Sequence, residues 1–282
     1  MRPGLVNVAE KEAALKGIGF FFGPIKVKLD TRDMAPARYY SWKYRDFLCS
    51  ATADAAIHVS VCNDSKDPCG QEKQAALQEN EILEIFDGPG FKTKIVSIRG
   101  VVQVTAIGPA CLEGSNLGLQ YAASHVYSEK SGLLIHGALI ESQGKGLLLA
   151  GPSGAGKTTL AGILGERAYC DELCMVQRQQ PLWKVWSTAL QNGRKACFDL
   201  TATILLQRGQ VLSLSRASSR EAVKGISSQI IVPRDGPGRI SGWSTALDLA
   251  LSVPCYKLIH GPSLPAAAEL EELLANVRGA VK

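Results

Sequence analysis

The hydrophobic pattern of the first 115 residues alternates over short distances, which predicts strands. Apolar and polar positions alternate within a few residues, and glycine or proline separates one such segment from the next. The expected strands are Phe20–Leu29, Ile57–Val61, Glu81–Phe86, Lys92–Ile98 and Val101–Ile107. The last three resemble a meander with turns at Gly88–Gly90 and Gly100, and Asn63–Gly70 is expected to be a loop. No group of catalytic residues is recognisable in this part.

From residue 116 the pattern changes to longer elements. Apolar residues recur at helical spacing in Asn116–Ser128, which predicts a helix. Two strands should follow, Gly132–Ile140 and Gly146–Ala150, joined by a tight turn at Ser142–Lys145. The second of them, GLLLA, is continuously apolar, as is typical of a strand buried on both faces.

Strands and helices alternate along the remainder of the chain. The other expected strands are Cys174–Val176, Trp183–Trp186, Thr203–Gln207 and Cys255–Ile259, and the expected helices are Thr158–Gly165, Ser219–Gln229, Trp243–Val253 and Pro265–Arg278. Such alternation indicates a sheet covered by helices. We therefore expect an α/β protein in which residues 116–282 form the larger domain and residues 1–115 a smaller, strand-rich α+β domain.

Composition narrows the class of protein. A chain of 282 residues with 46% hydrophobic and 20% charged residues has enough apolar material for a sizeable core, which excludes wholesale disorder. Residues 1–120 hold 14 basic and 14 acidic side chains, whereas residues 121–282 hold 17 basic and 12 acidic, so the net charge of +5 arises in the second part. This excess is too small and scattered for a nucleic-acid-binding surface, but it suits a site for a compact anion such as a nucleotide.

The cysteines and the longest apolar runs indicate a cytoplasmic protein without a membrane partner. None of the eight cysteines forms a C-x-x-C motif, and Cys170 and Cys174 have no neighbouring histidine to complete a metal site. No apolar run reaches the roughly 18 residues that a membrane helix needs. The N-terminal sequence MRPGLVNVAEKEAALKG lacks the apolar segment of a secretory signal.

The chemistry is carried by Gly151–Thr158, GPSGAGKT, which fits the P-loop or Walker A pattern G-x-x-x-x-G-K-[ST]. Its glycines allow several backbone N–H groups to point into one concavity, and the following helix adds the partial positive charge of its N-terminus. Lys157 should reach the β- and γ-phosphates, and the Thr158 hydroxyl should ligate Mg²⁺. The residues expected to bind the nucleotide are Gly151, Ser153, Gly154, Ala155, Gly156, Lys157, Thr158 and Thr159.

A phosphate loop alone does not identify the reaction, so other residues must indicate it. Asp171 and Glu172 follow the lysine by 14 and 15 positions, after a short helix. A carboxylate beside the phosphate loop can hold Mg²⁺, which we assign to Asp171 together with Thr158, or accept a proton from an attacking hydroxyl. Which of the two acids is the base stays open. His136 lies on the strand that pairs with the phosphate-loop strand, so it should also lie near the loop.

The run Gly132–Thr158, GLLIHGALIESQGKGLLLAGPSGAGKT, resembles the core of the HPr kinase/phosphorylase family and related serine kinases of peptide-modification clusters. That family has a His-Gly strand, a short turn, a second strand, the phosphate loop and then a paired acid, and it shares its core with ATP-dependent phosphoenolpyruvate carboxykinases. The resemblance covers residues 130–282 and implies a P-loop kinase domain. It assigns a catalytic role to His136, Lys157, Asp171 and Glu172. Because relatives form oligomers, it also allows for a homo-oligomer.

The resemblance implies an ATP- and Mg²⁺-dependent transfer of the γ-phosphoryl group to a hydroxyl acceptor, a serine of a protein or peptide or a small molecule. The HPr-kinase signature with a P-G-R-N core is absent, because Ile240 follows Pro237–Arg239. HPr is therefore not the expected acceptor. Two alternatives stay open: a nucleotide-binding regulatory or scaffold protein without transfer activity, and a P-loop ATPase.

Overall fold

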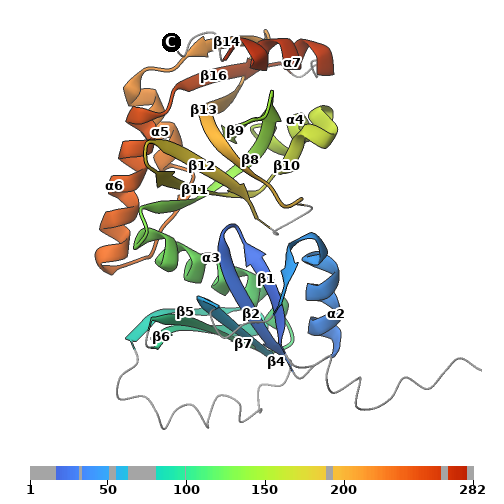
Figure 1. The fold of residues 1–282 in the computed structure, drawn as a ribbon, viewed down its shortest axis with the longest axis vertical. Helices are drawn as coiled ribbons and strands as arrows, with labels where there is room; N and C mark the ends of the chain where they lie inside the picture. The colour runs from blue at the N-terminus through green and yellow to red at the C-terminus, as the bar shows by residue number, and fades with distance from the viewer. Residues whose placement is uncertain are drawn as a thin grey trace, which may run out of the picture. The chain divides into compact units, whose positions relative to one another are not determined.

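The computed structural model describes residues 17–31, 34–50, 55–62, 81–98, 100–188, 193–261 and 266–277. The chain divides into two compact units, Met1–Ala123 and Ser124–Lys282. Helix α3, Cys111–Ser128, crosses this division, and the predicted boundary between residues 115 and 116 falls inside it. The predicted loop Asn63–Gly70 and the two ends of the last predicted helix, Pro265 and Arg278, lie outside the described residues. The fold is mixed α/β with two sheets (Figure 1).

The first unit contains a seven-stranded sheet in the order β3-β1-β2-β4-β7-β6-β5. Its strands are β1 (Ile18–Phe22), β2 (Ile25–Thr31), β3 (Leu48–Cys49), β4 (Ile57–Cys62), β5 (Glu81–Gly88), β6 (Phe91–Ile98) and β7 (Val101–Ile107). The meander β5-β6-β7 matches the predicted pairing of neighbouring strands. The single predicted strand Phe20–Leu29 is wrong: it is a hairpin, because Gly23 adopts a φ of 62° and turns the chain before Ile25.

Among its described residues, the first unit also contains the helix α2 (Met34–Lys43), the short 3₁₀ turn η1 (Arg45–Phe47) and the first part of α3. Glycines let α3 approach the sheet closely. A Cβ atom at Gly118 would lie 2.5 Å from Val104 Cγ1, and one at Gly114 would lie 2.5 Å from Thr93 Oγ1. The helix therefore packs on β6 and β7 through its backbone.

The second unit contains a nine-stranded sheet in which two long strands each serve two sets of neighbours. Its strands are β8 (Gly132–Ser142), β9 (Lys145–Ala150), β10 (Ala168–Cys170), β11 (Leu173–Gln179), β12 (Leu182–Ser187), β13 (Cys197–Arg208), β14 (Ser213–Arg216), β15 (Ile230–Ile231) and β16 (Cys255–His260). β8 pairs with β11 through residues 132–136 and with β9 through residues 137–142. β13 pairs with β12 through residues 197–199, and farther along it runs parallel to β9 and β16.

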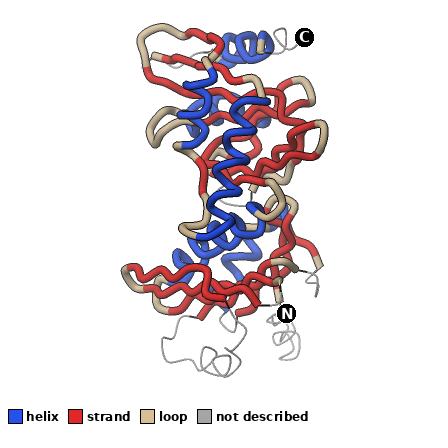
Figure 2. The backbone as a smooth tube through the Cα atoms, turned by 90° about the vertical axis from the view of Figure 1, so that its left-hand side faces the viewer, coloured by secondary structure: helices blue, strands red, loops and turns tan. Residues whose placement is uncertain are grey.

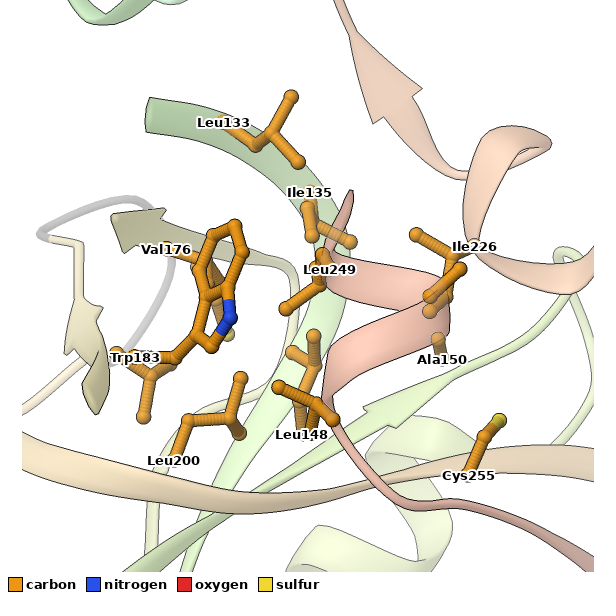
Figure 3. Packing of buried hydrophobic residues seen from close by; sticks show 14 of the residues in the cluster. Leu133, Ile135, Leu148, Ala150, Val176, Trp183, Leu200, Ile226, Leu249 and Cys255 are labelled. Carbon is orange, nitrogen blue, oxygen red and sulfur yellow. The ribbon is translucent and has the colours of Figure 1, made fainter. Parts of the chain in front are cut away.

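Helices pack on both faces of the parallel strands β9, β13 and β16. Figure 2 shows a long helix lying in front of strands of this unit. The helices of this unit are α4 (Lys157–Leu164), η4 (Gly165–Arg167), α5 (Ser219–Ser227), α6 (Gly236–Ser252) and α7 (Ala267–Asn276). Side chains alternate along β9, so Leu148 and Ala150 pack with α5 and α6, whereas Leu147 and Leu149 pack with α4 and α7. Figure 3 shows the first of these cores, in which Leu148 and Leu249 lie among the apolar side chains of β8, β11, β12 and β13.

Two elements of the second unit begin well before the starts that the sequence pattern predicted. α6 begins at Gly236, seven residues before the predicted start at Trp243, because a proline at the first or second helical position needs no backbone donor. β13 begins at Cys197, before the predicted Thr203, and its polar first part carries Asp199. Lys145 and Lys184 each lie 2.8 Å from that carboxylate, so its charge is balanced within the sheet. None of the described helices is long and apolar enough to cross a membrane.

Candidate functional site

The hairpin of β8 and β9 sets the position of the loop at Gly151–Gly156. Gln143 and Gly144 join the two strands with φ values of 49° and 77°, a turn whose twist suits antiparallel neighbours. β9 is buried from Gly146 to Ala150, so its end is fixed by packing on both faces. The loop therefore starts from a rigid point of the sheet.

The loop turns back on itself and leads into α4. Gly154 and Gly156 have φ values of 75° and 102°, which residues with a Cβ atom rarely adopt. The Ala155 N–H donates to the Pro152 carbonyl at 3.0 Å, and Gly156 is the N-cap of α4. The helix begins at Lys157, so its first N–H groups and the loop amides lie at the positive end of the helix dipole.

The Lys157 side chain lies along the inside of this loop. Only 5% of the residue is exposed, and the ammonium group donates to the Gly151 carbonyl at 2.7 Å and to the Pro152 carbonyl at 3.2 Å. Burial lowers the pKa of Lys157 from its ordinary value. The ammonium group is therefore held inside the loop by two of the loop's own carbonyls.

Three strands meet at Gly137 on β8. On one side Gly137 is the register partner of Ala150, the last residue before the loop. On the other side its N–H donates to the Glu172 carbonyl at 3.0 Å, and the neighbouring His136 is paired with Leu173. The histidine, the start of the loop and the acidic pair are thus at the same level of the sheet.

These groups line one cavity of about 290 Å³. Its lining consists of His136, Ser153, Gly154, Gly156, Lys157, Thr158, Thr159, Asp171, Glu172 and Arg208. All the predicted site residues are among them except Gly151 and Ala155, which line a neighbouring larger cavity. The cavity therefore combines backbone donors, cationic groups, hydroxyl groups and two carboxylates.

The surroundings of His136 favour the neutral form of its imidazole. Burial lowers the pKa of this histidine, and the positive charge of Lys157 lowers the pKa further. A neutral imidazole can accept a hydrogen bond from a hydroxyl group, which an imidazolium cannot do.

Replacing Lys157 with methionine should raise the pKa of His136 toward the usual value of about 6.5, because a nearby positive charge disfavours the imidazolium form. The pKa is measured by NMR titration of the imidazole protons. Lys130→Met, at an exposed turn, is the control and should leave the titration unchanged. An unchanged titration in Lys157→Met would contradict the coupling. In the wild-type protein, stability should fall as the pH drops from about 6.5 through the lowered folded-state pKa.

Two residues that the sequence did not identify support the loop from neighbouring strands. Arg208, at the end of β13, donates from Nε to the Gly154 carbonyl at 2.9 Å. His260, at the end of β16, is 6% exposed, and its Nε2 lies 2.7 Å from the Ala155 carbonyl, to which it must donate. Because β9, β13 and β16 are parallel, their carboxyl ends meet at one edge of the sheet. Both residues directly follow a predicted strand, and this is the sequence feature by which they could have been found.

The two positive-φ glycines of the loop should respond differently to alanine. A Cβ atom at Gly156 would lie 2.8 Å from the His260 ring, whereas one at Gly154 would have no neighbour within 4 Å. Gly154→Ala should therefore lose only about 1 kcal/mol of stability from backbone strain, and Gly156→Ala at least about 2–3 kcal/mol. Urea denaturation measures the difference. Equal losses would show that the histidine ring does not constrain the loop.

The donor set suits a magnesium ion bound mainly through a ligand. Mg²⁺ takes one or two protein oxygens and fills its remaining positions with water and phosphate oxygens. The hydroxyl of Thr158 and the carboxylate of Asp171 both line the small cavity. Within the described parts of the chain, no cluster of three or more His, Cys, Asp or Glu side chains could hold a metal by itself. Cys170 and Cys174 lie with their sulfur atoms 3.4 Å apart but belong to no such cluster.

Comparisons with known proteins give a family match and distant likenesses to solved structures. No curated protein gives a significant match to the chain. Among solved structures, the HPr(Ser) kinase/phosphatase from Coxiella burnetii is 11% identical, with a TM-score of 0.32, covering 51% of this chain and 95% of its own. A likeness at that level does not establish a shared fold or activity.

The family match concerns the part of the chain that contains the cavity. The family described as "SynChlorMet cassette protein ScmC" matches residues 117–263. This range includes His136, the whole loop and the acidic pair, and it spans more than half of the 282 residues. The chain therefore belongs to the ScmC family of SynChlorMet cassette proteins.

Proposed function

We propose that this protein is an ATP- and Mg²⁺-dependent kinase that transfers the γ-phosphoryl group to a hydroxyl acceptor, a serine of a peptide or protein. One observation carries the proposal: a phosphate-type loop with its lysine, a histidine and two carboxylates line the same cavity of about 290 Å³. The loop and Lys157 are the groups that bind phosphates, and the carboxylates are the groups that activate an alcohol.

The loop fits a phosphate chain. Gly154 has no neighbouring atom within 4 Å of the place where a Cβ atom would lie, so a phosphate oxygen can approach the backbone there. The first N–H groups of α4 are directed toward the same end, where negative charge is favoured. In the bound state, the Lys157 ammonium group would exchange its two loop carbonyls for phosphate oxygens.

The proposed reaction is an in-line displacement. The acceptor oxygen forms a bond to the γ-phosphorus, and the bond from that phosphorus to the β–γ bridging oxygen breaks, which releases ADP. The proton of the hydroxyl group passes to one carboxylate of the pair Asp171 and Glu172. Thr158 and Asp171 would hold Mg²⁺, which neutralises charge on the β- and γ-phosphate oxygens when it is bound.

His136 has a positioning role in this scheme. It lies in the same cavity as the acidic pair, and its neutral imidazole can accept a hydrogen bond from the acceptor hydroxyl or orient it. The carboxylates remain the proton acceptors.

Labelled ATP tests the proposal directly. The full chain is incubated with Mg²⁺, γ-labelled ATP and serine-containing peptides. The peptides are taken from precursor peptides encoded in a cassette that also encodes a member of this family. We expect label on a serine, located by mass spectrometry, and none on the matched alanine peptides. Release of free phosphate with no labelled peptide would instead indicate an ATPase. Binding of ATP without its consumption would indicate a scaffold protein.

A further inference from the structure

A second, larger cavity of about 960 Å³ adjoins the phosphate-type loop. The outer side of the loop contributes its residues 151–155, the end of β13 contributes residues 205–208, and α5 contributes Glu221, Lys224, Gly225 and Ser228. Ser153, Gly154 and Arg208 line both this cavity and the small one. The two cavities are therefore adjacent compartments along one side of the loop.

The small cavity is too small for a whole nucleotide. Sites for small organic ligands usually measure about 300–1,000 Å³. The small cavity, at about 290 Å³, lies at the lower end of this range and must also admit the acceptor hydroxyl, whereas the large one, at about 960 Å³, lies near the upper end.

The distribution of the acids decides which substrate occupies which cavity. Asp171 and Glu172 line the small cavity and not the large one. The acceptor hydroxyl and the γ-phosphoryl group must both reach those carboxylates, so both belong in the small cavity. What remains for the large cavity is the part of the nucleotide that does not react.

The lining of the large cavity suits that part. Leu205 and Leu206 supply apolar surface, and Lys224 supplies a cation on α5. The one carboxylate in the lining, Glu221, is already paired: its Oε1 accepts from Lys257 at 2.8 Å, and its Oε2 accepts from the Ser218 N–H at 2.9 Å. The cavity therefore offers apolar contact and positive charge without a free negative charge.

We propose that the large cavity binds the nucleoside of the nucleoside triphosphate, with the phosphate chain passing Ser153, Gly154 and Arg208 into the small cavity. This assignment rests on the proposed kinase function. α5 then forms one wall of the nucleoside site, a role that the sequence of this helix does not suggest.

The experiment compares ATP with inorganic tripolyphosphate, which carries the phosphate chain but no nucleoside. Tryptophan is introduced at one of two positions of the wall, Lys224→Trp or Ser228→Trp, and the control is Ser219→Trp at the first residue of the same helix, outside both cavities. Affinities for both ligands are measured by isothermal titration calorimetry with Mg²⁺, and folding is checked by circular dichroism.

We expect ATP to bind at least about tenfold more weakly, which is about 1.4 kcal/mol, in at least one of the folded wall variants. In the same variant, the affinity for tripolyphosphate should stay within about twofold of wild type. Ser219→Trp should change neither affinity. Unchanged ATP binding in both folded wall variants would overturn the nucleoside site, and so would equal weakening of both ligands. A wild-type protein that binds neither ligand would refute the kinase proposal itself, a different result from either of these.

Discussion

The Lys157→Ala variant should transfer phosphoryl groups at least about a thousandfold more slowly than the wild-type protein, which is about 4 kcal/mol of lost transition-state stabilisation. The reason is that Lys157 is buried and its ammonium group lies at the loop carbonyls, where a positive charge acts more strongly on phosphate oxygens than it does in water. ATP should also bind more weakly, because part of the charge on the phosphates is then unbalanced. The measurement is initial-rate kinetics with saturating ATP, together with calorimetric binding.

The fold should survive this change. Alanine leaves the Gly151 and Pro152 carbonyls without their ammonium donor, which costs stability. It also removes a buried ammonium group, and the pKa of that group is lowered because its charge is unfavourable when buried. We expect a melting temperature close to wild type. Lys130→Ala, on an exposed turn of the same unit, is the matched control and should keep full activity. Retained transfer activity in folded Lys157→Ala would refute the assignment.

Neutralising Asp171 should separate binding from turnover. Asp171→Asn keeps the shape of the side chain and an oxygen that can still coordinate Mg²⁺, but it removes the capacity to take a proton. We therefore expect ATP affinity within about threefold of wild type and a turnover lower by about 10²–10⁴-fold. Glu172→Gln is the parallel variant, and the acid whose neutralisation lowers turnover more is the base. Asp235→Asn, an exposed acid at the start of α6 outside both cavities, is the control.

Two results would change this assignment. Equal losses of ATP affinity and turnover in Asp171→Asn would indicate that this carboxylate only holds the metal. Full turnover in both Asp171→Asn and Glu172→Gln would remove the acidic pair from the mechanism.

The sequence located the hairpin and the loop because their signals are local. The apolar strands around residues 132–150 and the glycine-rich segment that follows are contiguous, and their pairing needs only a two-residue turn. The first turns of α6 were missed, because Gly236 and Pro237 resemble a loop in any local window, although proline is well tolerated at the start of a helix.

The supporting residues of the site could not be found in this way. Arg208 and His260 act on the loop only because β13 runs parallel beside β9 and β16 runs parallel beside β13. Parallel pairing joins segments that are 50 or more residues apart along the chain, and no local pattern of hydrophobicity specifies which strands become neighbours. The large cavity has the same origin, since it joins the loop to α5.

The junction at Gly137 has a consequence for how the site forms. A Cβ atom there would lie 2.7 Å from the Leu149 carbonyl, and the strand connects the loop on one edge to Glu172 on the other. A polypeptide ending near residue 165 would contain the glycine-rich segment but neither of the two acids, and of the three parallel strands it would have only β9. During synthesis, the acids and the two side chains that hold the loop, Arg208 and His260, should therefore join the glycine-rich segment late, when most of the chain has been made.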